Sequence, residues 1–152
     1  MRGLRHLLSL VLAVFLIAVI LHWTLHPWPN PKDGFVLLYD LPGEHIVFAM
    51  LAERSGIELF EPTLRVGLGC ALLLAALAMV FSPLRRFGAG LTGVCCGVLL
   101  AAQVSPWGSV ELAQSATSET LDEGSQFYLT MAVLTAAALL IWVHPDRKTR
   151  SG

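Results

Sequence analysis

Four charged side chains, Glu53, Arg54, Glu61 and Arg65, are the residues best suited to hold a ligand or an ion pair. Arg65 lies about one turn inside an apolar run, where burying a charge is expensive. It must either extend its guanidinium group to lipid headgroups or pair with an acid. Glu61 precedes it by four residues and would share its helix face, and Glu53 is the alternative partner. We expect an ion pair, and the four residues form our candidate site for a partner or a small ligand.

Three histidines form a second, weaker pattern. His22 and His26 are four residues apart, which is the spacing of two metal ligands on one helix face, and His45 is an additional donor. This spacing is common by chance, and the other apolar runs contain no histidine to complete a metal or haem site. We therefore expect no metal; only if the chain is a subunit of a quinone-linked redox enzyme would His22 or His45 be a hydrogen-bond partner for the quinone.

The three cysteines all fall within apolar runs. Cys70 and Cys96 lie at similar distances from one end of their runs, so a redox pair is conceivable, and Cys95 is adjacent to Cys96. The chain has no C-x-x-C motif, and buried cysteine often acts as a small apolar side chain. We expect the cysteines to fill space in the core.

Four apolar runs must position these residues, at about residues 7–25, 62–81, 88–104 and 127–143. Hydrophobic residues make up 55% of the 152-residue chain and charged residues only 14%, which argues against a soluble domain. Each run is close to the roughly 20 residues that a membrane-spanning helix needs. We predict an all-α fold, an integral membrane four-helix bundle that forms one domain over residues 1–152. A net charge of −1 offers no basic face for nucleic acid.

The charges predict an orientation for this bundle. Both termini and the Arg85–Arg86 turn are basic, whereas the first and third connections carry ten of the eleven acids. The positive-inside rule then places both termini in the cytoplasm, with the chain in a bacterial inner membrane. A signal peptide is the alternative for the N-terminus. We expect an uncleaved span, because the run ends in His-Trp-Thr-Leu-His-Pro-Trp and not in a small-residue cleavage site.

Two further patterns concern packing. Residues 44–55 place apolar side chains at helical spacing and are followed by Gly56, which predicts a short amphipathic helix in the first outer loop, lying at the surface or capping the bundle.

Small residues recur every four positions in the third run. They form a stripe that would let another helix approach closely: Ala89, Gly93, Gly97 and Ala101.

The order of short motifs is also informative. Ala-Glu-Arg-Ser-Gly-Ile at 52–57 is followed by Phe-Glu-Pro at 60–62, Arg65 and Gly67; later come Pro83 with a basic turn, Gly-Ala at 88–89, and Gly124-x-x-Phe127. This order resembles the DoxX-like group of small four-span membrane proteins. The resemblance implies the same topology, and for some members an association with quinone-linked sulfur oxidation or redox-stress complexes. Many members carry a glutamate in the second span where this chain has Cys70.

Function follows less directly from these patterns. The chain contains no Walker loop, G-x-S-x-G, H-E-x-x-H or dinucleotide motif, so we expect a non-catalytic or accessory membrane component without a cofactor. Its partners would be the lipid bilayer and either another membrane protein or a second copy. The alternative is a membrane subunit of a quinone-linked redox enzyme, with Arg65 orienting the quinone. A transporter component is a second alternative, although the apolar runs contain no central acid to line a path.

Overall fold

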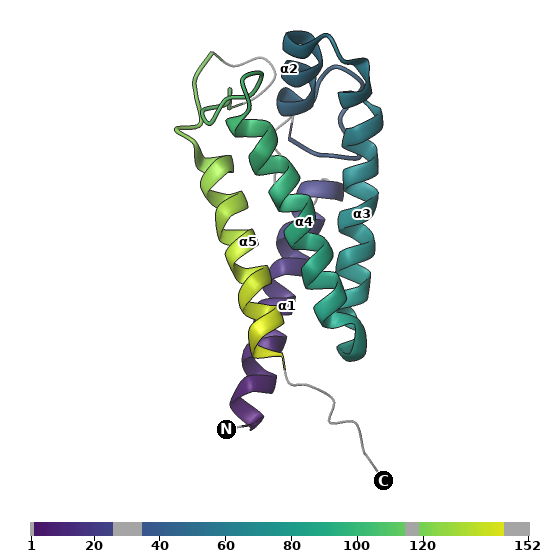
Figure 1. The fold of residues 1–152 in the computed structure, drawn as a ribbon, viewed down its shortest axis with the longest axis vertical. Helices are drawn as coiled ribbons and strands as arrows, with labels where there is room; N and C mark the ends of the chain where they lie inside the picture. Colours follow the sequence, from purple (N-terminus) through teal and green to yellow (C-terminus); the bar gives the residue numbers. More distant parts are fainter. Residues whose placement is uncertain (1, 26–34, 115–118, 145–152) are drawn as a thin grey trace.

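A computed structural model describes residues 2–25, 35–114 and 119–144, which form α-helices and short 3-10 helices but no strand (Figure 1). The helices are α1 (Arg2–Leu25), α2 (Ile46–Ser55), η1 (Glu58–Phe60), α3 (Thr63–Val80), η2 (Ser82–Leu84), α4 (Arg85–Val104) and α5 (Ser125–Val143). The chain is thus all-helical over its described part, as the sequence predicted.

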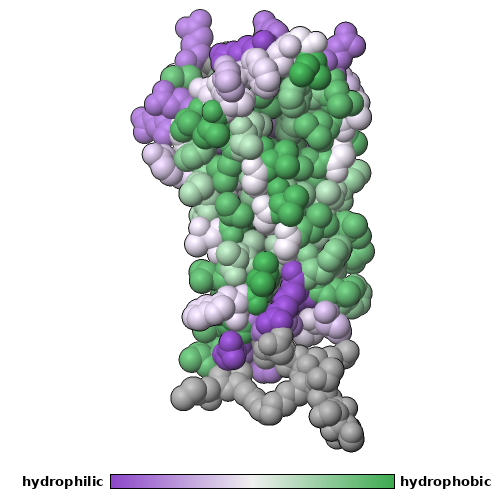
Figure 2. Space-filling model, in the orientation of Figure 1, coloured by the Kyte–Doolittle hydropathy of each residue, from purple (hydrophilic) through white to green (hydrophobic). Residues whose placement is uncertain are grey.

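Four of these helices, α1, α3, α4 and α5, are long and apolar enough to cross a membrane. Their outward faces carry large apolar side chains such as Leu7, Leu74, Val94 and Leu139, and the visible face of the molecule is apolar along most of its length (Figure 2). A soluble protein would cover such a surface with charge. These features indicate a multi-pass membrane protein.

The four long helices form one bundle in which α1 packs on α3 and α5, and α4 also packs on α3 and α5. The start of α1 lies at the same end of the bundle as the end of α5 (Figure 1). The interior is filled by apolar side chains that are fully buried, including Leu16, Leu72, Met79 and Leu140.

The helix bounds differ from the predicted spans mainly at their first turns. Helix α1 begins at Arg2 and helix α4 begins at Arg85, whereas the apolar runs that predicted them begin at residues 7 and 88. A hydropathy run marks the apolar part of a helix, whereas the helix itself continues as long as its backbone hydrogen bonds do. The basic residues at these two positions therefore belong to the helices and not to the connections.

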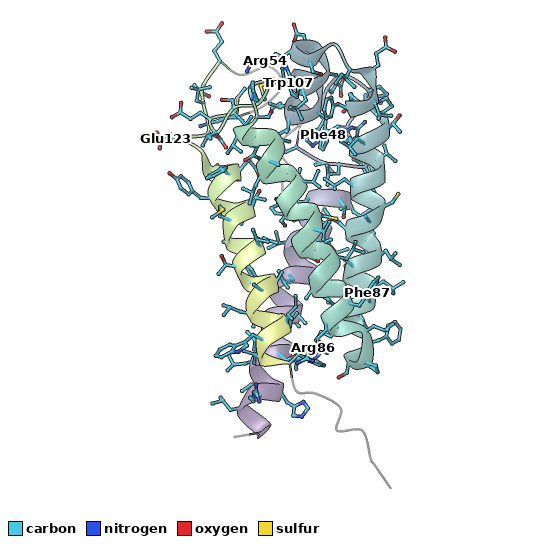
Figure 3. The ribbon with its side chains drawn as sticks, viewed as in Figure 1. Phe48, Arg54, Arg86, Phe87, Trp107 and Glu123 are labelled. Atoms are coloured by element: carbon cyan, nitrogen blue, oxygen red, sulfur yellow. The ribbon has the colours of Figure 1, made fainter. Side chains whose placement is uncertain are left out.

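The two ends of the bundle differ in charge. At one end, α2 and the 105–124 connection carry acids, and we call it the acidic end. At the other end, which we call the basic end, α1 and α4 begin with Arg5, Arg85 and Arg86. Figure 3 shows Arg54 at the acidic end and Arg86 at the basic end.

The predicted amphipathic helix is present as α2, and it caps the acidic end. Its apolar side chains Val47, Phe48 and Leu51 are buried and belong to the main core. The helix ends where Gly56 adopts a left-handed conformation with φ of 71°, and the Gly56 N–H donates to the Ala52 carbonyl. This helix is therefore part of the bundle, and its polar face points outward.

Only the first half of the small-residue stripe of α4, Ala89 and Gly93, faces other helices, which corrects the prediction for Gly97 and Ala101. Ala89 is fully buried, but a Cβ at Gly97 would meet no atom within 4 Å, and Ala101 is exposed. Positions four apart rotate by about 40° at each step, so Ala101 lies about 120° around the helix from Ala89. The stripe leaves the interior as it proceeds along α4, and Gly93 makes only ordinary contact with Leu134.

The close approach of α3 and α4 occurs instead at Gly88, near the basic end. A Cβ at Gly88 would lie 2.5 Å from the Ala75 carbonyl oxygen and 2.7 Å from the Met79 Cγ. Only glycine fits this contact without a shift of the neighbouring backbone. The residue that allows the close contact is therefore Gly88, which directly precedes Ala89, the first residue of the predicted stripe.

Candidate functional site

Arg65 forms a buried ion pair with Glu61 at the acidic end. The Arg65 Nε donates to both carboxylate oxygens of Glu61, at 2.7 and 2.9 Å, and the two side chains are only 2% and 5% exposed. The predicted pairing with Glu61 is confirmed, and Arg65 does not extend to the molecular surface. Since the positive charge is neutralised inside the protein, the guanidinium is not available as a free cation for a ligand.

The same guanidinium holds a segment that enters the bundle before α2. Its Nη1 donates to the Leu37 carbonyl at 2.6 Å, and one turn later on α3 Gly69 provides the space into which the Leu38 side chain packs. The Leu37 N–H donates in turn to the Trp23 carbonyl at the end of α1. Arg65 therefore fixes residues 37–38 between α1 and α3.

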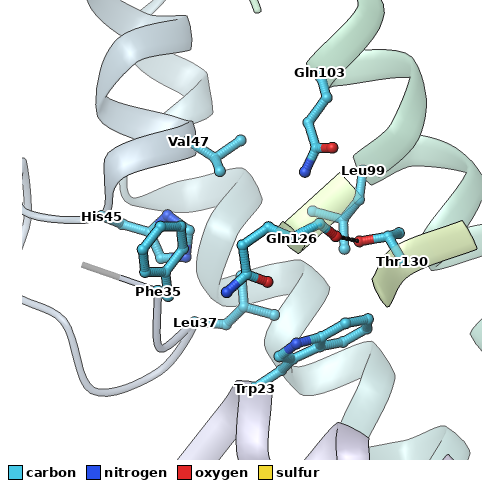
Figure 4. A pocket seen from close by; sticks show the side chains of 9 residues that line it. All are labelled: Trp23, Phe35, Leu37, His45, Val47, Leu99, Gln103, Gln126 and Thr130. Atoms are coloured by element: carbon cyan, nitrogen blue, oxygen red, sulfur yellow. Dashed lines mark hydrogen bonds between the residues drawn. The ribbon is translucent and has the colours of Figure 1, made fainter. Parts of the chain in front are cut away.

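This segment forms one wall of a cavity between the bundle and α2 (Figure 4). The cavity is small, with about 30 Å³ of space for the centres of water-sized molecules, and it is partly open to the outside. Most of its wall is apolar, and the polar side chains come from three elements. The lining residues are Trp23, Phe35, Leu37, His45, Val47, Leu99, Gln103, Gln126 and Thr130.

Two side chains in this cavity have buried polar atoms without hydrogen-bond partners among the described residues. Both ring nitrogens of His45 and the Oε1 of Gln103 make no hydrogen bond, although these residues are only 3% and 4% exposed. Figure 4 shows the Gln103 amide extending from α4 into the space above Leu99 and Gln126. Buried polar groups in native proteins nearly always have a partner, so these atoms are free to hydrogen-bond to a ligand or to water.

The ionisation of His45 restricts the ligand further. Burial and the nearby positive charge of Arg65 lower the pKa of His45 to about 3, so the ring is neutral at physiological pH. One ring nitrogen then donates a hydrogen bond and the other accepts one. Together with a primary amide and apolar walls, a neutral imidazole suits an uncharged molecule that carries oxygen atoms.

The four charged residues of the candidate site are not joined into one cluster. Arg65 and Glu61 are buried together, whereas Arg54 is exposed and its Nη1 donates to the Gly108 carbonyl at 3.2 Å. Glu53 is exposed and makes no ion pair with Arg65. The sequence therefore located the buried pair, and the remaining two charges lie on the surface.

The histidines and cysteines are also separated. His45 is buried in the cavity while His22 is exposed on α1, and His26 lies outside the described residues. In the described part of the chain, no group of three histidine, cysteine or acidic residues is arranged to hold a metal. Cys70 is exposed and free, whereas Cys95 and Cys96 are free and buried, so Cys70 and Cys96 do not pair.

The sequence did not single out the cavity residues other than His45. Gln103 could have been found, because it is the most strongly polar side chain in the 88–104 run. Trp23 and Leu37 gave no signal, since tryptophan is common at membrane interfaces and leucine is common everywhere.

Comparison of the chain with models of protein families, with curated proteins and with solved structures found no match. The case for a function therefore rests on the residues of the acidic end.

Proposed function

We propose that this chain is a non-catalytic accessory component of a bacterial inner membrane, similar to DoxX-like proteins, and that its cavity binds a small uncharged molecule. The alternation of basic and acidic segments supports an orientation with both termini in the cytoplasm, so the cavity faces the other side. The observation that carries the proposal is that atoms of His45 and Gln103, in a largely apolar cavity, have no hydrogen-bond partner among the residues that the structure describes.

The ion pair has a supporting role in this proposal. Arg65 neutralises Glu61 and holds Leu37, whose side chain lines the cavity. A buried pair that fixes the wall of a cavity makes the site rigid, which lowers the entropy cost of binding. Arg65 is thus a positioning residue, and the ligand is held by the neutral groups.

A test is to purify the tagged full-length protein in mild detergent and identify the molecules that co-purify by mass spectrometry. We expect a small molecule with the parent and at least tenfold less with Gln103→Leu. The empty Gln103→Leu protein should be as stable as the parent or more so, because an unpaired buried amide oxygen is removed.

The matched control is Thr135→Val, which changes a polar side chain on the exposed face of α5. It should retain the molecule at the parental level. Equal recovery from the parent and from Gln103→Leu would contradict the proposal, as would a parent that purifies without any small molecule.

A quinone-linked redox subunit is the second candidate function, and the neutral state of His45 favours it. Quinone carbonyl oxygens accept hydrogen bonds, which a neutral imidazole N–H and an amide N–H donate. Titration with a short-chain benzoquinone should quench the fluorescence of Trp23, which lines the cavity. The quenching should be reduced in Trp23→Phe and in Gln103→Leu; quenching that is equal in all three proteins would argue against this candidate.

A further inference from the structure

The basic end carries a second polar cluster, formed by α1, the start of α4 and the end of α5. Ser9 is fully buried and its Oγ lies 2.7 Å from the Nδ1 of His144. The Arg85 Nη1 donates to the same Ser9 Oγ at 3.3 Å, and its Nε donates to the Met79 carbonyl at 3.1 Å. Arg5 is one turn before Ser9, and its Nη2 donates to the Trp142 carbonyl at 3.4 Å.

All of the acceptors in these contacts are neutral. They are backbone carbonyls at the ends of α3 and α5 and the hydroxyl of Ser9, and the Arg86 Nη2 likewise donates to the His144 carbonyl. The final carbonyls of a helix attract cations, which explains why the arginines gather here. These carbonyl and hydroxyl oxygens do not neutralise the positive charge of an arginine, whereas the Glu61 carboxylate does so for Arg65 at the acidic end.

The two arginines that face this cluster also retain unused donors. A guanidinium has five N–H donors, and within the described residues Arg5 uses one of them and Arg85 uses two. No carboxylate occurs in residues 2–25, 79–104 or 125–144, which are the described segments that reach this end. Burial lowers the pKa of His144, and the charges of Arg85, Arg86 and His6 lower it further. His144 therefore adds no charge to the cluster at neutral pH.

We propose that the cluster at Arg5 and Arg85 binds the phosphate group of an anionic phospholipid. Guanidinium groups bind phosphate oxygens through paired N–H donors, and basic sites between membrane helices hold such headgroups. Large apolar side chains flank the cluster and would contact acyl chains, because Trp142 is 74%, Phe87 59% and Leu84 50% exposed. This inference rests on the proposed membrane insertion but is independent of the cavity ligand.

The source of the phosphate is a lipid and not a soluble anion. Figure 2 shows hydrophilic side chains directly beside the apolar surface at the basic end, so an anion bound there contacts both charge and hydrocarbon. Free phosphate would gain only the contact with charge, and it would lose part of its hydration on binding.

The experiment measures binding of phosphatidylglycerol, phosphatidylcholine and inorganic phosphate to the full-length protein in mild detergent, by native mass spectrometry and by the shift in melting temperature. Phosphatidylglycerol should bind the parent at least tenfold more tightly than phosphatidylcholine. Each of Arg5→Gln and Arg85→Gln should weaken phosphatidylglycerol binding about fivefold.

Arg54→Gln is the matched control, since it removes an arginine that also donates to a single carbonyl but lies at the acidic end. It should leave lipid binding unchanged. Equal binding of the two lipids by the parent would overturn the proposal, and this readout does not depend on the variants folding. An equal loss in Arg54→Gln would also overturn it, as would stabilisation by inorganic phosphate as strong as that by phosphatidylglycerol. Loss of the cavity ligand would leave these results untouched.

Discussion

At the acidic end the buried cation has a carboxylate partner, whereas at the basic end Arg5 and Arg85 donate to carbonyl and hydroxyl oxygens and to no carboxylate among the described residues. The unpaired polar groups are accordingly of opposite kinds. Within the part of the chain that the structure describes, they are the neutral His45 and Gln103 at the acidic end and the cationic Arg5 and Arg85, without a carboxylate partner, at the basic end. The first set suits an uncharged ligand and the second suits an anion.

The two ends also differ in how closely the helices approach. Near the basic end, Gly88 brings α4 against the backbone of α3, while near the acidic end α4 carries Leu99 and Gln103, which line the cavity. Glycine at the first position admits the backbone of α3, whereas the larger side chains at the second position line a cavity whose other walls include residues of α1, α2 and α5.

The largest effect should come from filling the close contact. Gly88→Leu should lower the free energy of unfolding by more than about 3 kcal/mol, because even its Cβ would meet the Ala75 carbonyl oxygen at 2.5 Å. Gly97→Leu should change it by less than about 0.5 kcal/mol, since no atom lies within 4 Å of that Cβ. Thermal or denaturant unfolding in detergent measures both. If Gly97→Leu were as damaging as Gly88→Leu, the outer half of the stripe would face a second helix or a second copy.

The next effect compares the two arginine sites directly. Arg65→Ala should destabilise the protein by about 3 kcal/mol, because it leaves the 5%-exposed Glu61 carboxylate without its partner. Arg85→Ala should cost about 1 kcal/mol, since its acceptors are neutral. Arg65→Lys should recover only part of the loss because its ammonium lacks the planar guanidinium.

A double-mutant cycle of Arg65→Ala with Glu61→Gln separates the ion pair from the packing of Arg65. We expect a coupling energy above about 1 kcal/mol with Glu61→Gln and none with Glu53→Gln. A cycle in which Glu53 couples to Arg65 would contradict the assignment of Glu61 as the partner.

The sequence predicted those features whose energetic cost is local. Four apolar runs predicted four helices, because a lipid-facing backbone must satisfy its own hydrogen bonds. The spacing of Glu61 and Arg65 predicted their pairing for a similar reason: a charge inside an apolar run needs a partner, and an acid at i−4 is within reach. Both inferences depend only on residues that are close together in the chain.

The cavity and the helix contacts could not be predicted in this way. Leu37 lines the cavity only because its segment returns to the bundle, where it bonds to the end of α1 and to Arg65 on α3. Gly88 and Gly97 are both glycines in one helix, and only the position of α3 shows which of them is at the contact. Such features depend on which elements meet, and a single sequence does not specify this.

Acid should weaken the acidic end before it affects the contacts among neutral acceptors at the basic end. The buried Asp122 carboxylate accepts hydrogen bonds from the backbone N–H groups of Leu112, Gly124 and Gln126. Although burial raises its pKa, these bonds and that of Ser125 outweigh it, so the pKa of Asp122 lies below its ordinary value of 3.8. Its contribution to stability is complete above 3.8 and is lost as the pH falls through the lower folded-state pKa.

Asp122→Asn tests this at neutral pH, where it should cost about 1 kcal/mol because an NH2 group replaces one of the two acceptor oxygens at the start of α5. The variant should also lose stability less steeply than the parent as the pH is lowered below 3.8. The measurement is the unfolding midpoint in detergent across that pH range. Identical pH profiles for the two proteins would show that Asp122 is not the group whose protonation weakens the acidic end.

The smallest effect should come from Arg5, and it separates stability from binding at the basic end. Arg5 is exposed, and its one hydrogen bond to the described residues is a long one, 3.4 Å to the Trp142 carbonyl. In a zwitterionic detergent, Arg5→Gln should therefore change the free energy of unfolding by no more than about 0.5 kcal/mol. Phosphatidylglycerol should stabilise this variant much less than it stabilises the parent, because the variant lacks the unused N–H donors of Arg5 that we assign to the phosphate. If Arg5→Gln were strongly destabilising without lipid, the residue would be a structural cap of α5, and the contrast between a paired cation at one end and ligand-binding cations at the other would no longer hold.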